Sequence, residues 1–220
     1  KLQGVRERVW HACDRAGRPR DAVRLLAVSK TFGADAVREA AAAGQTAFGE
    51  NYVQEGVDKV LALRGQPGLP ALEWHCIGPL QSNKTRPVAE HFDWVQSVAR
   101  LKTAQRLSEQ RPARLPPLQV CLQVNVDGGA NKSGVSPAEL PALAHAVAAL
   151  PRLRLRGLMA IPEPAPDAES ARAVFTQVLT LFEDLKREGL DLDTLSMGMS
   201  DDLEAAIAAG ATLVRVGRAI

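Results

Sequence analysis

The apolar positions at the start of the chain follow the spacing of an amphipathic helix. Leu2, Val5, Val9, Ala12 and Cys13 fall on one face when the chain is wound at about 3.6 residues per turn. A glycine follows at position 17, and glycine is common just after the last turn of a helix. The pattern therefore predicts an N-terminal helix.

From residue 25 onward, short apolar runs alternate with helical patterns. The first run covers residues 25–30 and is typical of a buried strand, and a helix is expected at about 34–43. The same alternation continues and gives eight strands, which start near Leu25, Thr46, Glu73, Trp94, Leu118, Leu153, Thr194 and Leu213. The helices expected after the second to the seventh strand cover about residues 52–63, 83–90, 101–109, 137 onward, 167–188 and 201–209.

Two of these helices carry clear local signals. The tetrapeptide Ser136-Pro137-Ala138-Glu139 combines an N-cap hydroxyl, a proline at the first helical position and a glutamate at the third. The helix at 167–188 has an apolar stripe, formed by Ala171, Val174, Phe175, Val178, Leu181, Phe182 and Leu185. Such a stripe is typical of a helix that packs on a sheet.

Eight strands separated by helices indicate an α/β protein whose parallel sheet closes into a (β/α)8 TIM barrel. An open doubly wound sheet is the alternative. No proline- or glycine-rich segment is long enough to divide the chain, so residues 1–220 are expected to form a single domain with the N-terminal helix as an addition.

Composition and charge exclude several classes of partner. Hydrophobic residues make up 46% of the chain, and the net charge of +2 comes without a basic block, so nucleic acid is not expected as a partner. No apolar stretch reaches bilayer length, and residues 1–10 do not resemble a secretory signal. The cysteines, Cys13, Cys76 and Cys121, are odd in number and widely spaced, which favours reduced thiols. We expect a cytoplasmic monomer without membrane contact, and the four histidines lack the spacing of a metal site.

Lys30 is the first candidate for chemistry. It ends the apolar run of the first strand, and the C-terminal ends of barrel strands are where such proteins bind ligands. Burial of an ammonium group is costly and lowers its pKa, and a neutral amine attacks aldehydes and ketones. Lys30 is therefore a candidate for Schiff-base formation, and the alternative is a lysine whose amine reaches solvent.

Other residues lie at the ends of the remaining strands and would share one face of a barrel. They are Glu50, Asn51, His75, Gly78, Asn125, Met159, Ser200, Gly217 and Arg218. The segment from Gly198 to Asp202 opens a helix after the seventh strand, where barrels often bind phosphate. The alternative for Ser200 is a simple N-cap.

Five motifs in order give the chain a specific family resemblance. They are Leu26-Ala27-Val28-Ser29-Lys30-Thr31, Phe48-Gly49-Glu50-Asn51-Tyr52-Val53-Gln54-Glu55, Trp74-His75-Cys76-Ile77-Gly78-Pro79-Leu80-Gln81-Ser82-Asn83-Lys84, Arg156-Gly157-Leu158-Met159-Ala160-Ile161-Pro162 and Ser196-Met197-Gly198-Met199-Ser200-Asp201-Asp202. With these motifs the sequence closely resembles the YggS/PROSC family of proteins that bind pyridoxal 5′-phosphate (PLP).

This resemblance implies a barrel like the N-terminal domain of alanine racemase, with PLP held as a Schiff base on Lys30. It places Ser200, Gly217 and Arg218 at the phosphate and Arg215 at the pyridine nitrogen, and it places Asn51, His75 and Met159 around the pocket. Position 218 departs from the family, since many relatives have a small hydroxyl residue there, although a guanidinium also binds phosphate. The chain also ends at Ile220, where the family usually continues with Phe-Gly and a closing helix.

The resemblance further implies a role in PLP homeostasis and in amino-acid and keto-acid balance, with PLP-dependent apo-enzymes as recipients and little or no catalysis. An arginine cannot accept the ring proton, and two positive charges about 4 Å apart repel by about 4 kcal/mol at an effective dielectric constant near 20, so the ring nitrogen should stay neutral. A PLP-dependent racemase of narrow scope that uses Lys30 and His75 is one alternative. A barrel aldolase that uses Lys30 without PLP is another.

Two further lysines, Lys84 and Lys132, have two interpretations. They are solvated surface lysines, or they form a secondary site for an anion or for PLP transfer.

Overall fold

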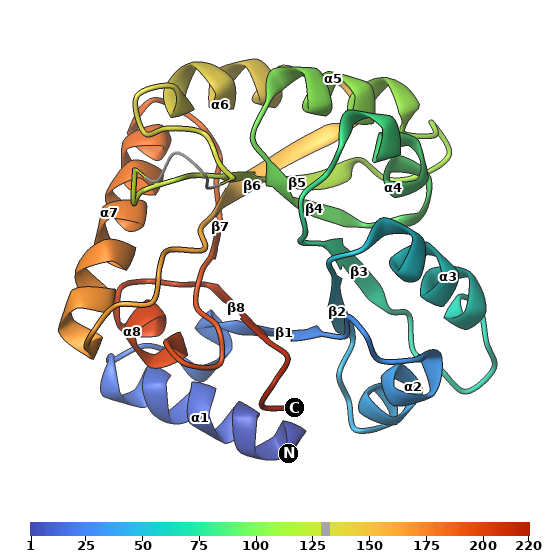
Figure 1. Ribbon diagram of the computed structural model, residues 1–220, viewed down its shortest axis with the longest axis horizontal. Helices are drawn as coiled ribbons and strands as arrows, with labels where there is room; N and C mark the ends of the chain where they lie inside the picture. The colour runs from blue at the N-terminus through green and yellow to red at the C-terminus, as the bar shows by residue number, and fades with distance from the viewer. Residues whose placement is uncertain (129–132) are drawn as a thin grey trace.

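The computed structural model describes residues 1–128 and 133–220, and they form a closed barrel of eight parallel strands. The strands follow one another around the barrel in chain order, and Figure 1 looks down onto this ring. Their bounds are β1 Arg24–Val28, β2 Ala47–Glu50, β3 Glu73–Cys76, β4 Trp94–Val98, β5 Leu118–Gln123, β6 Leu153–Met159, β7 Thr194–Ser196 and β8 Leu213–Val216. The predicted barrel is confirmed, and the open sheet is excluded.

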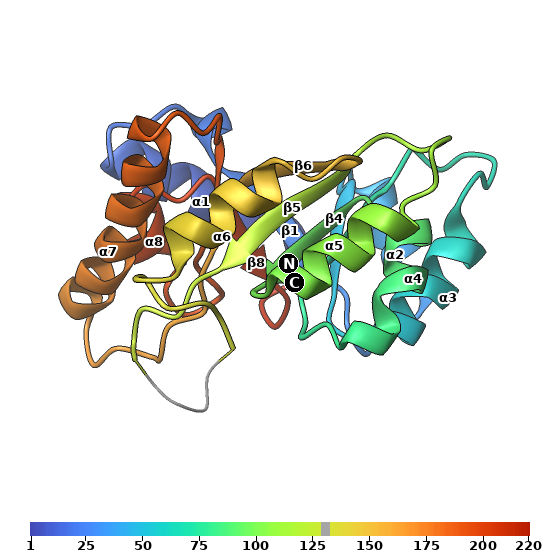
Figure 2. The same ribbon diagram turned by 90° about the horizontal axis from the view of Figure 1, so that it is seen from above.

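Helices surround the barrel on its outside (Figures 1 and 2). The α-helices are α1 Leu2–Arg15, α2 Ala34–Ala42, α3 Val53–Leu63, α4 Thr85–His91, α5 Leu101–Gln110, α6 Leu140–Ala148, α7 Ala168–Arg187 and α8 Leu203–Ala208. Two short 3₁₀ helices, η1 Arg20–Ala22 and η2 Ser82–Lys84, precede β1 and α4. The predicted N-terminal helix is α1, which packs beside α8.

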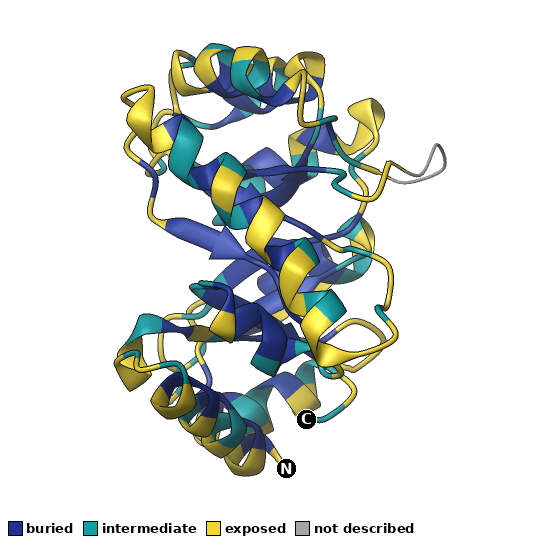
Figure 3. Cartoon of the chain, turned by 90° about the vertical axis from the view of Figure 1, so that its left-hand side faces the viewer, coloured by how far each residue is buried: buried dark blue, intermediate teal, exposed yellow. Residues whose placement is uncertain are grey.

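The core lies between the strands and the helices (Figure 3). Phe48, Trp74 and Leu158 are buried on the strands, and Phe175 and Leu185 are buried on α7. Strands of parallel sheets are covered on both faces, which explains their nearly continuous apolar runs. Within the described residues, no helix is both long and apolar enough to cross a bilayer.

Some strands and helices begin or end a few residues away from the positions predicted from the sequence. Strand β1 stops at Val28, so Lys30 lies in a turn beyond the strand. Helix α6 begins at Leu140, although Ser136 and Glu139 do contact each other as predicted: the Glu139 amide donates to Ser136 Oγ at 3.3 Å. The capping contacts therefore form in a turn that leads into the regular helix.

Barrel closure sets the neighbours of Lys30. Strand β1 pairs with β8 in a register that sets Ala27 opposite Val216, and β1 also pairs with β2, where Val28 lies opposite Gly49. Lys30 therefore emerges next to the chain that follows β8.

Candidate functional site

A cavity of about 860 Å³ opens at the C-terminal end of the strands. Its size is within the usual range of small-molecule sites. Six of the eight predicted site residues line it: Lys30, Asn51, Ser200, Arg215, Gly217 and Arg218. The structure thus brings together residues that come from four different strand ends.

Lys30 enters the cavity from a tight turn. Phe32 donates its amide to the Ser29 carbonyl at 3.1 Å, which closes the turn around Lys30 and Thr31. Thr31 has a φ of 67°, in the left-handed region that β-branched residues rarely adopt. Lys30 is exposed, so the burial expected from its place at the strand end is wrong. Its amine forms no ion pair with any residue that the structure describes, so it is available to a ligand at the cavity.

Arg215 on β8 brings a buried positive charge to the cavity. Its side chain is 3% exposed, and burial lowers its pKa to about 10, which leaves it protonated near neutral pH. Nη1 donates to Ser196 Oγ at 2.6 Å, and Nη2 donates to the Ala160 carbonyl at 3.0 Å. Among the described residues no carboxylate pairs with this guanidinium, which suits a site that accepts an electron-rich ligand atom.

A chain of hydrogen bonds connects Arg215 to Glu73 through the barrel interior. Ser196 donates to Gln96 Oε1 at 2.5 Å, and the Gln96 amide lies 2.8 Å from His75 Nδ1. On its other side, His75 Nε2 lies 2.7 Å from Glu73 Oε1. An arginine can only donate and a carboxylate can only accept, so every bond in this relay runs from Arg215 toward Glu73.

The electrostatics of the relay fix the tautomer of His75. Burial lowers the pKa of His75, although the Glu73 carboxylate opposes this. Burial also acts to raise the pKa of Glu73, but the hydrogen bond from His75 together with the charge and the hydrogen bond of Arg24 outweigh it and lower the pKa. We infer a neutral His75 with its proton on Nε2 and a charged Glu73.

The loop after β7 offers backbone donors to the cavity. Helix α8 begins at Leu203 with Asp202 at its N-cap position, so Ser200 does not cap it. Asp202 Oδ1 accepts the Met199 amide at 2.7 Å, and Arg8 Nη2 from α1 donates to the Ser200 carbonyl at 3.0 Å. The amides of Ser200 and Asp201 donate to no other group in the described part of the chain, and they remain available to an anion.

The carboxylates around this loop all have partners. Asp201 pairs with Arg218 at 2.5 Å, and Glu204 pairs with Arg8 at 2.9 Å. Asp202 already accepts the amide described above. Their negative charge is thus partly compensated, so it opposes an anionic ligand less than a count of acidic residues suggests.

Asn51 lines the cavity with an unsatisfied polar atom. Its Oδ1 is buried and has no hydrogen-bond partner among the described residues. Gly78 lies directly against it, because a Cβ at position 78 would come 2.2 Å from the Asn51 carbonyl oxygen. A buried amide without a partner is costly, and a ligand group that bonds to it would remove that cost.

The other two predicted site residues lie below the cavity and do not line it. His75 and Met159 are both 0% exposed. The His75 ring stacks on Trp94 with ring centroids 4.9 Å apart, and Met159 packs with Trp94 and Cys121. They were predicted from their position near strand ends and from the family motifs, and neither signal separates cavity lining from barrel interior.

The sequence did not predict Ser196 and Gln96 as partners of Arg215 and His75. The available signal was a buried polar residue within an apolar strand, such as Gln96 in β4. Lys84 and Lys132 were the two lysines with a surface and an anion-site interpretation. Lys84 is exposed and does not line the cavity, and Lys132 lies outside the described residues. No group of three or more His, Cys, Asp or Glu in the described ranges is arranged to hold a metal ion.

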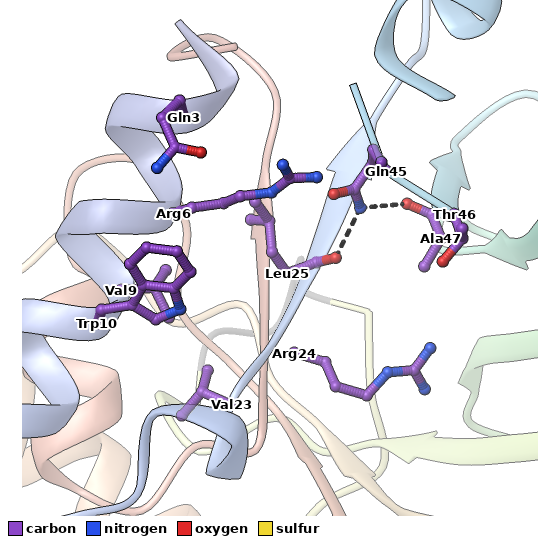
Figure 4. Close-up of a pocket in the computed structure, with 11 residues that line it drawn as sticks. Gln3, Arg6, Val9, Trp10, Val23, Arg24, Leu25, Gln45, Thr46 and Ala47 are labelled. Atoms are coloured by element: carbon purple, nitrogen blue, oxygen red, sulfur yellow. Dashed lines mark hydrogen bonds between the residues drawn. The ribbon is translucent and has the colours of Figure 1, made fainter. Parts of the chain in front are cut away.

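A second cavity of about 400 Å³ lies at the opposite end of the barrel (Figure 4). It is lined by residues of α1 and by the starts of β1 and β2, and Gln45 donates there to the carbonyls of Leu25 and Ala47. Because these partners are backbone groups, Gln45 serves to join the two strands.

Comparisons with known proteins agree on one group of relatives. The alanine racemase N-terminal domain family matches residues 2–220. The pyridoxal phosphate homeostasis protein of Pseudomonas aeruginosa is 62% identical over 216 residues, which cover 98% of this chain and 91% of that protein. The pyridoxal phosphate homeostasis protein of Escherichia coli K12 is 56% identical over 219 residues, which cover the whole of this chain and 93% of that protein. PipY of Synechococcus elongatus, solved with PLP bound, is 41% identical with a TM-score of 0.81, over 95% of this chain and 97% of that one.

Proposed function

Because the chain belongs to the pyridoxal phosphate homeostasis protein family, we propose that it binds PLP through Lys30 and serves to hold and deliver this cofactor. The observation that supports this most strongly is the meeting of three groups in one cavity: an unpaired amine, a buried guanidinium and a loop with unpaired amides. These groups match an aldehyde, a pyridine nitrogen and a phosphate.

The unsatisfied atoms of the cavity fit PLP. Asn51 has a buried Oδ1 without a partner, and an amide of this kind serves as donor or acceptor depending on which way it is turned. The amides of Ser200 and Asp201 suit a phosphate, with Arg218 beside them, although its pairing with Asp201 must loosen to contribute. Gly217 lets the chain after β8 lie close to β1, since a Cβ there would come 3.1 Å from Val28 Cβ.

Bound PLP supplies an aldehyde that condenses with a primary amine with loss of water, and a ring that accepts electrons best when its nitrogen is protonated. Lys30 provides the amine. Arg215 donates hydrogen bonds and cannot accept a proton, so it favours the unprotonated ring nitrogen. His75 and Met159 act below the cavity, His75 through the relay to Arg215 and Met159 through packing.

We propose little or no catalytic turnover. A racemase needs a second acid or base that reaches the substrate. The described cavity lining contains no histidine, cysteine or tyrosine: His75 is fully buried, and Tyr52 is 58% exposed and outside the lining. The lining does contain four carboxylates, and each accepts a hydrogen bond from the protein: Asp167 from Ser170, Asp201 from Arg218, Asp202 from Met199 and Glu204 from Arg8. The three free cysteines are buried, which supports a location in the reducing cytoplasm.

Borohydride reduction and peptide mapping test the proposal. Wild-type protein incubated with PLP should turn yellow, and reduction should fix PLP on the peptide that contains Lys30. The Lys30→Ala variant should lose both the colour and the label. A label on another lysine, or a colourless wild-type protein, refutes the proposal, and the colourless result favours an aldolase.

The racemase alternative is decided by proton exchange. Amino acids incubated with the PLP-loaded protein in D2O should keep their α-protons. Incorporation of deuterium above a PLP-only control would refute the proposed lack of turnover.

A further inference from the structure

A buried ionic cluster lies behind the turn that carries Lys30. We call it the Lys59 cluster, and it consists of Lys59, Glu50, Glu55 and Ser29. Lys59 Nζ lies 2.7 Å from Glu50 Oε1 and 2.7 Å from Glu55 Oε1, and it donates to the Ser29 carbonyl at 2.6 Å. Ser29 Oγ also donates to Glu50 Oε1, at 2.5 Å.

The cluster holds the backbone on both sides of Lys30. Before it, the carbonyl of Ser29 is bound by Lys59. After it, the amide of Thr31 donates to Glu55 Oε1 at 2.6 Å. Thr31 is in the left-handed region with φ 67°, a conformation that persists only where the surroundings enforce it. The Lys30 amine itself has no ion-pair partner in the described chain, so the cluster provides the fixed contacts of the turn.

Close packing of α3 against β2 brings the cluster together. A Cβ at Gly56 would come 2.5 Å from the Phe92 ring and 3.1 Å from Glu50 Cβ, so only glycine permits this approach. Lys59 and Glu50 are consequently 6% and 1% exposed. A buried lysine and glutamate are costly to desolvate, and a hydrophobic pair of similar volume often packs as well.

The pKa values of the two carboxylates shift in opposite directions. It raises the pKa of Glu50, against the effect of Lys59 and Ser29. For Glu55, burial acts in the same direction, but the bonds from Lys59 and Thr31 outweigh it and lower the pKa. Glu55 is therefore the charged carboxylate that receives the Thr31 amide next to Lys30.

We propose that Lys59 is a positioning residue for Lys30: through Glu55 and the Ser29 carbonyl it fixes the turn so that the Lys30 amine projects toward PLP. This inference rests on the proposed binding of PLP at Lys30. A misplaced amine condenses less readily even when the phosphate site is intact, because covalent bond formation demands closer alignment than ionic binding.

The test compares Lys59→Met with the wild type in two measurements. Equilibrium dialysis gives total bound PLP, and borohydride reduction followed by mass spectrometry gives the fraction fixed on Lys30. We expect Lys59→Met to weaken PLP affinity about tenfold or more and to lower the fraction fixed per bound PLP. Arg111→Met is the matched control, because Arg111 is a buried cation, 4% exposed, that donates to the carbonyls of Ala89, Phe92 and Pro116 away from the cavity.

A second pair of variants decides the question if Lys59→Met does not fold. Glu55 is partly exposed, with 28% of its side chain accessible, so its variants are expected to fold. Glu55→Ala removes the acceptor of the Thr31 amide and should reduce the fraction fixed. Glu55→Gln keeps an acceptor there and should recover most of it.

The outcomes separate this inference from the proposed function. If wild type fixes PLP on Lys30 and both Lys59→Met and Glu55→Ala fix it equally well, the positioning role is wrong and the proposed function stands. An equal loss in Arg111→Met would also overturn the positioning role, because general destabilisation would then explain the effect. If wild type fixes no PLP on Lys30, the proposed function itself fails.

Discussion

Replacing Ser196 by alanine tests the relay that supports Arg215. Ser196 is fully buried on β7, and its hydroxyl makes two hydrogen bonds: it accepts from Arg215 Nη1 at 2.6 Å and donates to Gln96 Oε1 at 2.5 Å. Alanine removes both bonds and leaves a charged donor and an amide oxygen without partners. No other described side chain is bonded to the guanidinium.

The two bonds set the expected loss of stability. A hydrogen bond that involves a charged group contributes about 1.5–3 kcal/mol, and a neutral one contributes about 0.5–1.5 kcal/mol. Ser196→Ala should therefore lower the free energy of unfolding by about 2–4.5 kcal/mol. PLP binding should weaken as well, because the guanidinium is held less firmly at the cavity.

Urea unfolding monitored by tryptophan fluorescence measures the stability, and titration of visible absorbance measures PLP affinity. Ser108→Ala is the matched control, since Ser108 on α5 is also buried and its hydroxyl donates only to the Pro151 carbonyl, a neutral partner. The control should lose about 1 kcal/mol and keep its PLP affinity. Equal losses of stability in the two variants, with equal PLP affinity, would refute the relay.

Three further variants test other parts of the site. Burial lowers the pKa of His75 below its ordinary value of 6.5, so as the pH falls through about 6.5 the unfolded chain binds a proton there more readily than the folded protein, and stability falls with the pH. His75→Gln should make the free energy of unfolding, measured by urea unfolding, depend less on pH. An unchanged pH dependence would show that other groups cause it. Gly78→Ala should displace the Asn51 backbone, with about 2 kcal/mol of destabilisation and weaker PLP binding; wild-type values in both measurements would contradict this contact. Thr31→Asn should raise the free energy of unfolding by about 1 kcal/mol, because asparagine tolerates the left-handed conformation better, whereas a loss of stability would show that the threonine side chain has a role of its own.

Local patterns in the sequence were sufficient to predict the barrel and its ligand-binding end. Apolar runs and helical periodicity located each strand and helix, because the periods of side-chain direction differ between the two structures. Lys30 and Ser200 were identifiable because each follows an apolar run at the end where barrels bind ligands. These features depend only on neighbours along the chain.

Tertiary structure alone decided which polar groups support the site. Gln96 and Ser196 are 100 residues apart in sequence, yet they share a hydrogen bond, and Lys59 reaches the Ser29 carbonyl from a helix 30 residues away. His75 was predicted beside the ligand but lies inside the barrel. Neighbouring residues of a strand point to opposite faces of the sheet, but the sequence of the strand does not say at which of its inward-pointing residues the cavity begins. Barrel closure and register fix these contacts, and both depend on the packing of the whole chain.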